Sequence, residues 1–246
     1  MTTVVLLGFG NVGQHLYKAF SASEKVKVVQ IYNRNFIETL QIPQCQDTSK
    51  LVEAHVYIIA VPDQAIGNLS AVLPFNGRFV VHTSGGVRMD VLSENNKRGV
   101  FYPLQTFSKD TKVDFSSIPI CIEAEQKTDL ALLKTIGSAV SEKVVEISSE
   151  EREKLHVAAV FVNNFSNHLY QIAETITKKN GLDFDILKPL ITETARKVQR
   201  LPPAQAQTGP AKRNDKKTIE KHLKLLKDSE YGELYEKLTE SIKNSG

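Results

Sequence analysis

The sequence has only two cysteines and no tryptophan, and it lacks a long apolar run. Cys45 and Cys121 are too far apart in the chain for a metal-ligand cluster or a redox dithiol motif, so two reduced thiols are the simplest interpretation and we predict no metal site. The longest apolar runs, residues 4–7 and 157–162, are far shorter than the roughly 20 residues that a helix needs to cross a bilayer. These shortages exclude a disulfide scaffold and argue against a membrane-spanning protein.

A strong net charge is also absent. The 31 basic and 28 acidic side chains leave a formal charge of +3, which is too small to indicate a nucleic-acid partner by itself. The first ten residues lack the basic start of a signal peptide and are interrupted by glycine, so a cytoplasmic location is the default expectation. What is present, 41% hydrophobic and 24% charged residues over 246 positions, is typical of a globular protein with one large or two modest domains.

Residues 1–148 alternate short runs rich in valine and isoleucine with helix-like stretches, which is the pattern of β-α units around a parallel sheet. The expected strands are 4–7, 26–31, 56–60, 79–82, 99–102, 118–123 and 143–147. The expected helices are 12–20, 64–73, 89–94 and 128–140.

From Ser148 onward the sequence predicts only helices. Ser148 followed by Glu151 is a capping box, and the absence of Gly and Pro from residue 150 to residue 179 predicts one helix of roughly 30 residues. Further helices are expected at 184–198, around Ile219, Leu223 and Leu226, and around Leu234, Leu238 and Ile242, with a Pro- and Gly-rich connection at 201–210. We therefore predict two domains, residues 1–148 and residues 149–246.

The most specific motif is G-F-G-N-V-G at residues 8–13, directly after the first expected strand and before the first expected helix. In such a turn Gly8 allows the tight bend, Gly10 lets the backbone approach a pyrophosphate, and Gly13 lets helix and strand pack closely. The N-terminus of the helix would face the phosphates. This placement favours a Rossmann dinucleotide-binding domain over a glycine-rich turn without a ligand.

The residues after the second strand bear on the choice of cofactor. NAD-binding domains usually have Asp or Glu there to hold the ribose hydroxyls, whereas residues 32–35 are Y-N-R-N. Arg34 is placed to meet a ribose 2′-phosphate, although it could also be an exposed loop arginine. We therefore expect NADP(H) rather than NAD(H). The residues predicted from the motif and the strand ends to contact it are Gly8, Phe9, Gly10, Asn11, Val12, Gly13, Asn33, Arg34, Asn35, Ala60, Val61 and Pro62.

Four further motifs are spread over nearly the whole chain: H-T-S-G-G at 82–86, Y-P-L-Q-T-F at 102–107, His156 with N-N-F at 163–165, and G-P-A-K-R-N-D at 209–215. With these motifs the chain resembles the superfamily that contains 6-phosphogluconate dehydrogenase, β-hydroxyacid dehydrogenases, ketopantoate reductase and pyrroline-5-carboxylate reductase. Within it, the chain is most similar to Rossmann-like proteins with a C-terminal domain of unknown function, often labelled as similar to deazaflavin-dependent NADP oxidoreductases. No residue pattern for deazaflavin itself stands out.

The resemblance implies an α/β fold in which a Rossmann domain is followed by an all-α domain like the C-terminal domain of 6-phosphogluconate dehydrogenase. It also implies that Thr83, Ser84 and Gly85 lie beside the nicotinamide, where the hydroxyl and a backbone N–H could hold a substrate carboxylate. The alternative is that Ser84 only caps the helix expected after Arg88. His82 could equally be a buried histidine.

In β-hydroxyacid dehydrogenases the long helix carries a lysine four residues before an asparagine, and that lysine is the proton donor. Here Ala159 and Val160 stand four residues before Asn163 and Asn164, so the lysine is missing. His156, two α-helical turns before Asn163, could transfer the proton instead while Asn163 orients a substrate oxygen. The alternative for His156 is a packed histidine on an apolar helix.

The two remaining motifs also supply candidates. Gln105 follows a strand that ends in proline and could line the same cleft. Tyr102 stands where, as we interpret the family, a histidine is usual. Arg213 could bind an anionic substrate or pair with Asp215.

The leading hypothesis is an NADP(H)-dependent oxidoreductase that acts on a small carbonyl, imine or hydroxy-acid substrate in the cleft between the domains. A homodimer through the helical domain is expected, and no nucleic acid or membrane partner. The rivals are a non-catalytic NADP(H)-binding sensor or assembly protein, and a Rossmann module without a dinucleotide. The predicted catalytic residues are His156, Asn163, Ser84 and Gln105, and the predicted substrate-binding residues are Ser84, Gly85, Gln105, Asn164 and Arg213.

Overall fold

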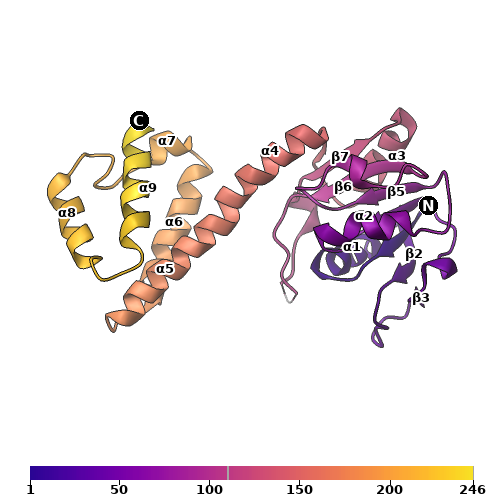
Figure 1. The fold of residues 1–246 in the computed structure, drawn as a ribbon, viewed down its shortest axis with the longest axis horizontal. Coiled ribbons are helices and arrows are strands. Elements are labelled where there is room, and N and C mark those ends of the chain that lie inside the picture. Colours follow the sequence, from indigo (N-terminus) through magenta and orange to yellow (C-terminus); the bar gives the residue numbers. More distant parts are fainter. Residues whose placement is uncertain (110, 246) are drawn as a thin grey trace. The chain divides into compact units, whose positions relative to one another are not determined.

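The computed structural model describes residues 1–109 and 111–245 and divides into two compact units, Met1–Asn163 and Asn164–Gly246 (Figure 1). The first unit contains a sheet flanked by helices, and the second contains helices. The predicted α/β class with a helical C-terminal region is therefore confirmed. The predicted domain boundary after residue 148 stays a prediction.

The first unit is built on an eight-stranded sheet in the order β3-β2-β1-β4-β5-β6-β7-β8. The part of this order from β3 to β6 is the strand order of a Rossmann fold. All neighbouring strands are parallel except β6 and β7. The strands are β1 Thr2–Leu7, β2 Val26–Tyr32, β3 Gln44–Cys45, β4 Val56–Ile59, β5 Phe79–His82, β6 Lys97–Pro103, β7 Ile120–Ala124 and β8 Val144–Glu146.

Three expectations for this unit were wrong in detail. The sheet is not all parallel, because β7 returns beside β6 without a crossover helix, and β3 was missed because two residues make no recognisable apolar run. The helix expected at 89–94 is only a 3-10 turn, Met89–Val91. There the backbone N–H of Met89 donates to the side chain of Ser149 rather than to a helical carbonyl.

Both faces of the sheet are buried, which explains why the strands are apolar without alternation. Helices α1 Asn11–Ser21 and α3 Lys127–Gly137 pack on one face and α2 Asp63–Ala71 on the other. Within β1, Val4 and Leu6 point to the first face while Val5 and Leu7 point to the second. Each such buried side chain stabilises the fold by about 1.5–3 kcal/mol.

Helix α4, Ser149–Ala159, begins at the predicted capping box, in which Ser148 and Glu151 exchange hydrogen bonds. The uninterrupted α-helix expected up to residue 179 was wrong, because residues 160–165 form a π-helical segment before α5, Ser166–Lys179. A π-turn bonds residue i to residue i+5 and so holds more residues than an α-turn. The seven-residue spacing therefore no longer predicts a shared face for His156 and Asn163.

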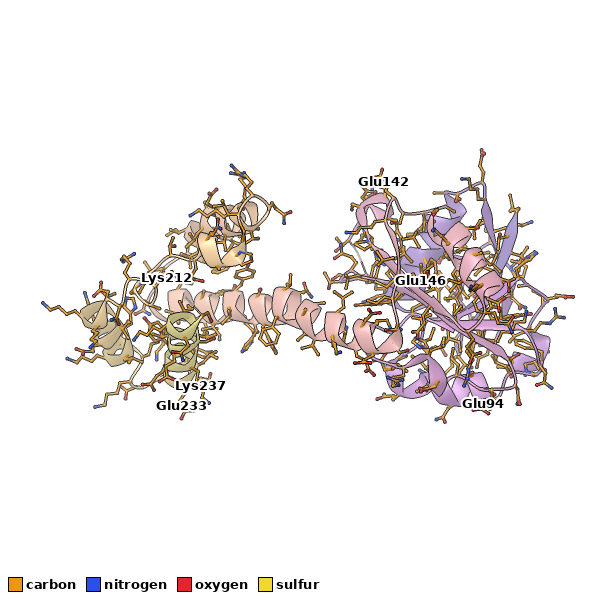
Figure 2. All side chains as sticks on the ribbon, turned by 90° about the horizontal axis from the view of Figure 1, so that it is seen from above. Glu94, Glu142, Glu146, Lys212, Glu233 and Lys237 are labelled. Atoms are coloured by element: carbon orange, nitrogen blue, oxygen red, sulfur yellow. The ribbon has the colours of Figure 1, made fainter. Side chains whose placement is uncertain are left out.

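The second unit consists of α5, the 3-10 turn Phe184–Leu187, α6 Lys188–Val198, α7 Pro203–Ala206, α8 Lys216–Leu225 and α9 Gly232–Asn244. The 201–210 connection, expected to be a loop, contains the short helix α7. Charged residues such as Glu233 and Lys237 cover the exposed side of α9 (Figure 2). Among residues 1–109 and 111–245, no helix is both long and apolar enough to cross a membrane.

Candidate functional site

The glycine-rich turn after β1 is shaped by close backbone contacts. Gly8 has a φ of +106°, and its N–H donates to the carbonyl of Tyr32 at 2.8 Å. A Cβ added to Gly8 would lie 2.4 Å from the carbonyl oxygen of Ala60, and one added to Gly13 would lie 2.4 Å from the carbonyl oxygen of Gly8. Only glycine fits at these two positions, as the motif predicts for a tight turn and close helix-strand packing.

Gly10 differs from both neighbours in the motif. It is the N-cap residue of α1, and a Cβ added to it would have no atom of the described residues within 4 Å. Residues 11–14, the first turn of α1, include no acid. The open space above Gly10 and the N-terminus of α1 together form a cradle whose polarity suits a phosphate.

The loop after β2 is held by Asn33. Its N–H donates to the carbonyl of Cys45 at 3.1 Å, and its side-chain amide donates to the carbonyl of Asn35 at 2.9 Å. Arg34, which stands between Asn33 and Asn35, is exposed, and residues 32–35 contain no carboxylate. The loop thus lacks the carboxylate that NAD-binding domains usually have there, and the predicted role of Arg34 stays a prediction.

Other predicted cofactor residues surround the same turn. Phe9 and Val12 pack partly against the core, and Val61 approaches Gly8. Asn11 donates from its side-chain amide to the carbonyl of Phe107 at 2.9 Å, which joins α1 to the loop after β6. Pro62 is the N-cap of α2, and Thr83 donates its N–H to the carbonyl of Ile59 at 3.2 Å.

A second turn, at the end of β5, is organised by Ser84. The Ser84 N–H donates to Nδ1 of His82 at 3.2 Å, and its hydroxyl accepts hydrogen bonds from the N–H groups of Gly86 and Val87 at 3.1 Å. The side chain thus stabilises its own turn, and its predicted contact with a substrate stays a prediction. Burial, with a smaller contribution from Arg152, lowers the pKa of His82 to about 4, so this imidazole is neutral at neutral pH.

Gly85 lies where two candidate side chains meet. A Cβ added there would be 2.6 Å from Nδ1 of His156 and 2.6 Å from Cζ of Tyr102. The Tyr102 hydroxyl lies 3.4 Å from Nδ1 of His156, and the two rings are arranged edge to face with centroids 6.3 Å apart. The structure therefore brings together β5, β6 and α4 through Gly85, Tyr102 and His156, all within the first unit.

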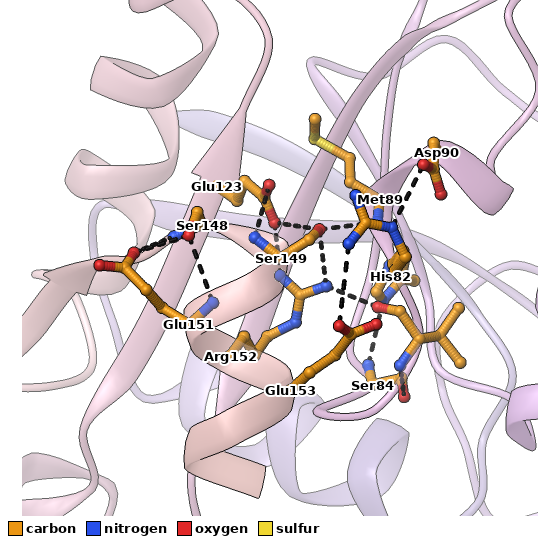
Figure 3. A network of polar contacts seen from close by, with 12 residues as sticks. His82, Ser84, Met89, Asp90, Glu123, Ser148, Ser149, Glu151, Arg152 and Glu153 are labelled. Carbon is orange, nitrogen blue, oxygen red and sulfur yellow. Dashed lines mark hydrogen bonds and ion pairs between the residues drawn. The ribbon is translucent and has the colours of Figure 1, made fainter.

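Beside this contact lies a buried ion pair that the sequence analysis missed (Figure 3). Arg152, fully buried on α4, donates to the carboxylate of Glu123 on β7, to the carbonyl of Val87 at 2.5 Å and to the hydroxyl of Ser149 at 3.2 Å. Ser149 in turn donates its hydroxyl to Glu123 at 2.8 Å. The start of α4 is thereby fixed to the sheet and to the turn that carries Ser84.

A sequence signal for Arg152 did exist. The capping box fixes the start of α4, and Arg152 precedes His156 by four residues, so the two lie on one face of the helix. Nothing in the sequence, however, identifies Glu123, 29 positions earlier in the chain, as the partner of Arg152.

The other predicted catalytic and substrate-binding residues lie at exposed positions. Gln105 is exposed, and its side-chain oxygen accepts from the N–H of Thr106 at 2.8 Å. Asn163 and Asn164 are exposed in the π-helical segment. Arg213 is exposed in the second unit, and the neighbouring Asp215 caps α8. Their predicted roles stay predictions.

The chain is similar to a known protein family and to several solved structures. Residues 118–242 match the family described as "Domain of unknown function (DUF2520)". A crystal structure from Bacteroides fragilis, named as that of a candidate NADP oxidoreductase, is 40% identical and covers 99% of this chain and 98% of its own, with a TM-score of 0.88. The chain belongs to the DUF2520 family.

More distant structures share the fold of this DUF2520 chain. A protein from Thermotoga maritima is 20% identical with a TM-score of 0.77, over 98% of this chain and 97% of that one. Pyrroline carboxylate reductase from Plasmodium falciparum, solved with NADP bound, is 14% identical with a TM-score of 0.61, over 98% of both chains. No curated protein matches significantly. The resemblance inferred from the motifs, to Rossmann-like proteins similar to NADP oxidoreductases, is confirmed.

Proposed function

We propose that the chain is an NADP(H)-dependent oxidoreductase acting on a small carbonyl, imine or hydroxy-acid substrate. The observation that carries the proposal is the turn after β1, where Gly8 and Gly13 are closed by backbone contacts while Gly10 is open at the N-terminus of α1. This is the arrangement in which a Rossmann turn holds a pyrophosphate. The names of the similar structures from Bacteroides fragilis and Plasmodium falciparum support the same class of activity.

The chain's own residues define what each part of the site contributes. The N–H groups at the start of α1 and the open face of Gly10 would hold the pyrophosphate, and the guanidinium of Arg34 would pair with the 2′-phosphate. When bound, the nicotinamide supplies or accepts a hydride. The proton that accompanies the hydride is assigned to His156, because an imidazole suits proton transfer near neutral pH and because this imidazole lies against Gly85 and Gly86.

Calorimetric titration with NADPH and NADH tests the cofactor assignment. We expect NADPH to bind more tightly than NADH, and Arg34→Ala to remove most of that preference by weakening NADPH binding about tenfold or more. Arg78→Ala is the matched control, since Arg78 is also an exposed arginine of the first unit but precedes β5 at the amino end of the strand. Equal affinity for both nucleotides, or an effect in the control of the same size, would contradict the assignment.

A non-catalytic NADP(H)-binding protein is the second candidate, because no lysine precedes Asn163 or Asn164 by four residues. The two candidates differ in turnover rather than in binding. Screening carbonyl, imine and hydroxy-acid panels for oxidation of NADPH or reduction of NADP separates them. Tight NADPH binding without turnover on every panel would favour the sensor or assembly role.

We also propose that the protein is a homodimer through its helical unit. Leu182, Ile186 and Leu190 recur every four residues and are 56%, 70% and 63% exposed. Leu182 lies in the loop before the 3-10 turn, Ile186 in that turn and Leu190 on α6, and exposed apolar side chains so near one another in the chain indicate an interface. Sedimentation should show a dimer that Leu190→Asp converts to a monomer while Lys237→Asp, on α9, does not. A wild-type monomer at all concentrations would overturn this proposal.

A further inference from the structure

The imidazole of His156 has two distinct sides. On one side Nδ1 faces the hydroxyl of Tyr102 at 3.4 Å. On the other side Cδ2 and Nε2 lie 3.4 and 3.7 Å from the position of a Cβ on Gly86, and Oδ2 of Asp63 lies 4.0 Å from that same position. Both ring nitrogens thus lie against the turn after β5, Nδ1 beside Gly85 and the phenol of Tyr102, and Nε2 beside Gly86.

The phenol has a hydrogen that it can donate to His156. Tyr102 is only 9% exposed, and a buried tyrosine hydroxyl usually requires a hydrogen-bond partner. Burial raises the pKa of Tyr102 to about 12, so its O–H keeps the hydrogen throughout the physiological range. Nδ1 of a neutral imidazole is an acceptor when the hydrogen resides on Nε2.

We propose that Tyr102 is a positioning residue that fixes the tautomer of the neutral, resting His156, so that Nδ1 accepts from the phenol and Nε2 carries the hydrogen on the side of Gly86. The identity of the protonated nitrogen in a histidine is set by the hydrogen bond that the other nitrogen makes. The contact between Tyr102 and His156 also requires glycine at position 85, because a Cβ there would lie 2.6 Å from both rings. The inference rests on the proposed function only for its catalytic consequence.

That consequence concerns pH. With hydrogen on Nε2, the neutral ring donates a hydrogen bond to a substrate oxygen or nitrogen. The cationic ring can transfer the Nε2 proton to the substrate, which leaves the remaining hydrogen on Nδ1, facing the oxygen of Tyr102. Among the described residues, Asp63 from α2 approaches the same Gly86 position as the ring, and Arg152 stands one turn earlier on α4, where it is paired with Glu123. Without Tyr102 the neutral ring could carry its hydrogen on Nδ1, and the neutral His156 would then not donate at Nε2.

The chain offers a matched control for this pair. In the second unit, the hydroxyl of Tyr235 lies 2.8 Å from Nδ1 of His222, also edge to face, at an interplanar angle of 80°. Tyr235→Phe therefore removes the same type of contact from a histidine outside the candidate site. His156→Gln and His222→Gln assign the corresponding signals.

The decisive experiment is nitrogen NMR of the full chain labelled with ¹⁵N-histidine, at a pH where the imidazoles are neutral and without added nucleotide. We expect His156 in the form with hydrogen on Nε2, and Tyr102→Phe to shift the ratio of the two forms about two- to tenfold toward the other, as expected for one lost hydrogen bond. Tyr235→Phe should alter only His222. Hydrogen on Nδ1 of His156 in the wild type, or an unchanged ratio in Tyr102→Phe, would overturn the proposal.

A second variant and a kinetic readout complete the test. Gly85→Ala should displace both rings and change the His156 ratio while thermal unfolding remains cooperative. With a substrate in hand, kcat for Tyr102→Phe should fall with rising pH more steeply than the wild-type value, while the dissociation constant for NADPH is unchanged. Because the NMR measurement needs neither nucleotide nor substrate, failure of NADPH binding would remove the proposed function and leave the tautomer result interpretable.

Discussion

The protein has two glycine-rich turns at the carboxyl ends of parallel strands, and they use glycine in opposite ways. After β1, Gly10 leaves open space that no described atom fills. After β5, Gly85 makes room that the chain itself fills with the rings of Tyr102 and His156. The comparison teaches that one turn is prepared for a ligand from outside, whereas the other is part of a packed contact among three elements.

The largest expected effect concerns the ion pair beside the second turn. Arg152→Met leaves the Glu123 carboxylate without its cation and should lower the free energy of unfolding by about 3–5 kcal/mol. Urea denaturation measures this loss. Arg78→Ala, which removes an exposed pair with Glu53, should cost no more than about 1 kcal/mol. Similar losses in both variants would contradict the view that Arg152 holds the second turn in place.

Within the first turn, Gly8→Ala should be nearly as damaging. Gly8 has a φ of +106°, and the new Cβ would lie 2.4 Å from the carbonyl oxygen of Ala60. The left-handed conformation and the steric overlap together should cost about 2–4 kcal/mol in urea denaturation. Gly77→Ala is the control, since it has a φ of +71° but no described atom within 4 Å of its Cβ position, and it should cost only about 1–2 kcal/mol.

His156→Ala tests whether the second turn carries chemistry. Loss of the proton-transfer group should lower kcat about a hundredfold, while the dissociation constant for NADPH, measured by calorimetry, stays nearly unchanged. His222→Ala is the matched variant in the second unit and should retain turnover. Unimpaired turnover of His156→Ala would remove His156 from the mechanism.

Because His82 is buried beside the second turn, the free energy of unfolding should depend on pH. Its pKa falls from 6.5 to about 4 on folding, so the unfolded chain binds the proton more tightly and the stability declines as the pH drops below 6.5. The loss reaches about 2 kcal/mol by pH 5. Urea denaturation between pH 7 and pH 5 should show a flatter dependence for His82→Gln than for the wild type. Parallel curves would contradict a neutral, buried His82.

The sequence was informative where the structure depends on neighbours in the chain. The turn at residues 8–13 and the capping box at Ser148 are complete within a few residues, and both are found where the motifs place them. The contact at Gly85 joins Tyr102 to His156, which stands 54 residues further along the chain, and no local pattern encodes such a contact. The π-helical segment could not be predicted either, because residues 160–165 contain no Gly or Pro that would mark an interruption of the α-helix.

The Arg152–Glu123 ion pair could not be predicted from the sequence either. A charged residue on a helix is usually exposed, so a fully buried arginine is not what composition predicts. Its burial depends on a carboxylate from β7 and a carbonyl from the turn after β5. Those partners are defined only once β7 has paired antiparallel with β6, the one strand direction that the sequence analysis had wrong.

The most direct test of the account is NADPH titration of the wild type beside Gly10→Val, with urea denaturation of both. Gly10 has an extended backbone that valine can adopt, and no described atom other than its chain neighbours lies within 4 Å of its Cβ position. Because valine is less favourable than glycine at a helix N-cap, the free energy of unfolding should fall by about 1 kcal/mol. We expect the wild type to bind NADPH and Gly10→Val to bind at least tenfold more weakly, because the side chain fills the cradle at α1. Equal binding by both proteins, or no binding by the wild type, would contradict a dinucleotide site at this turn.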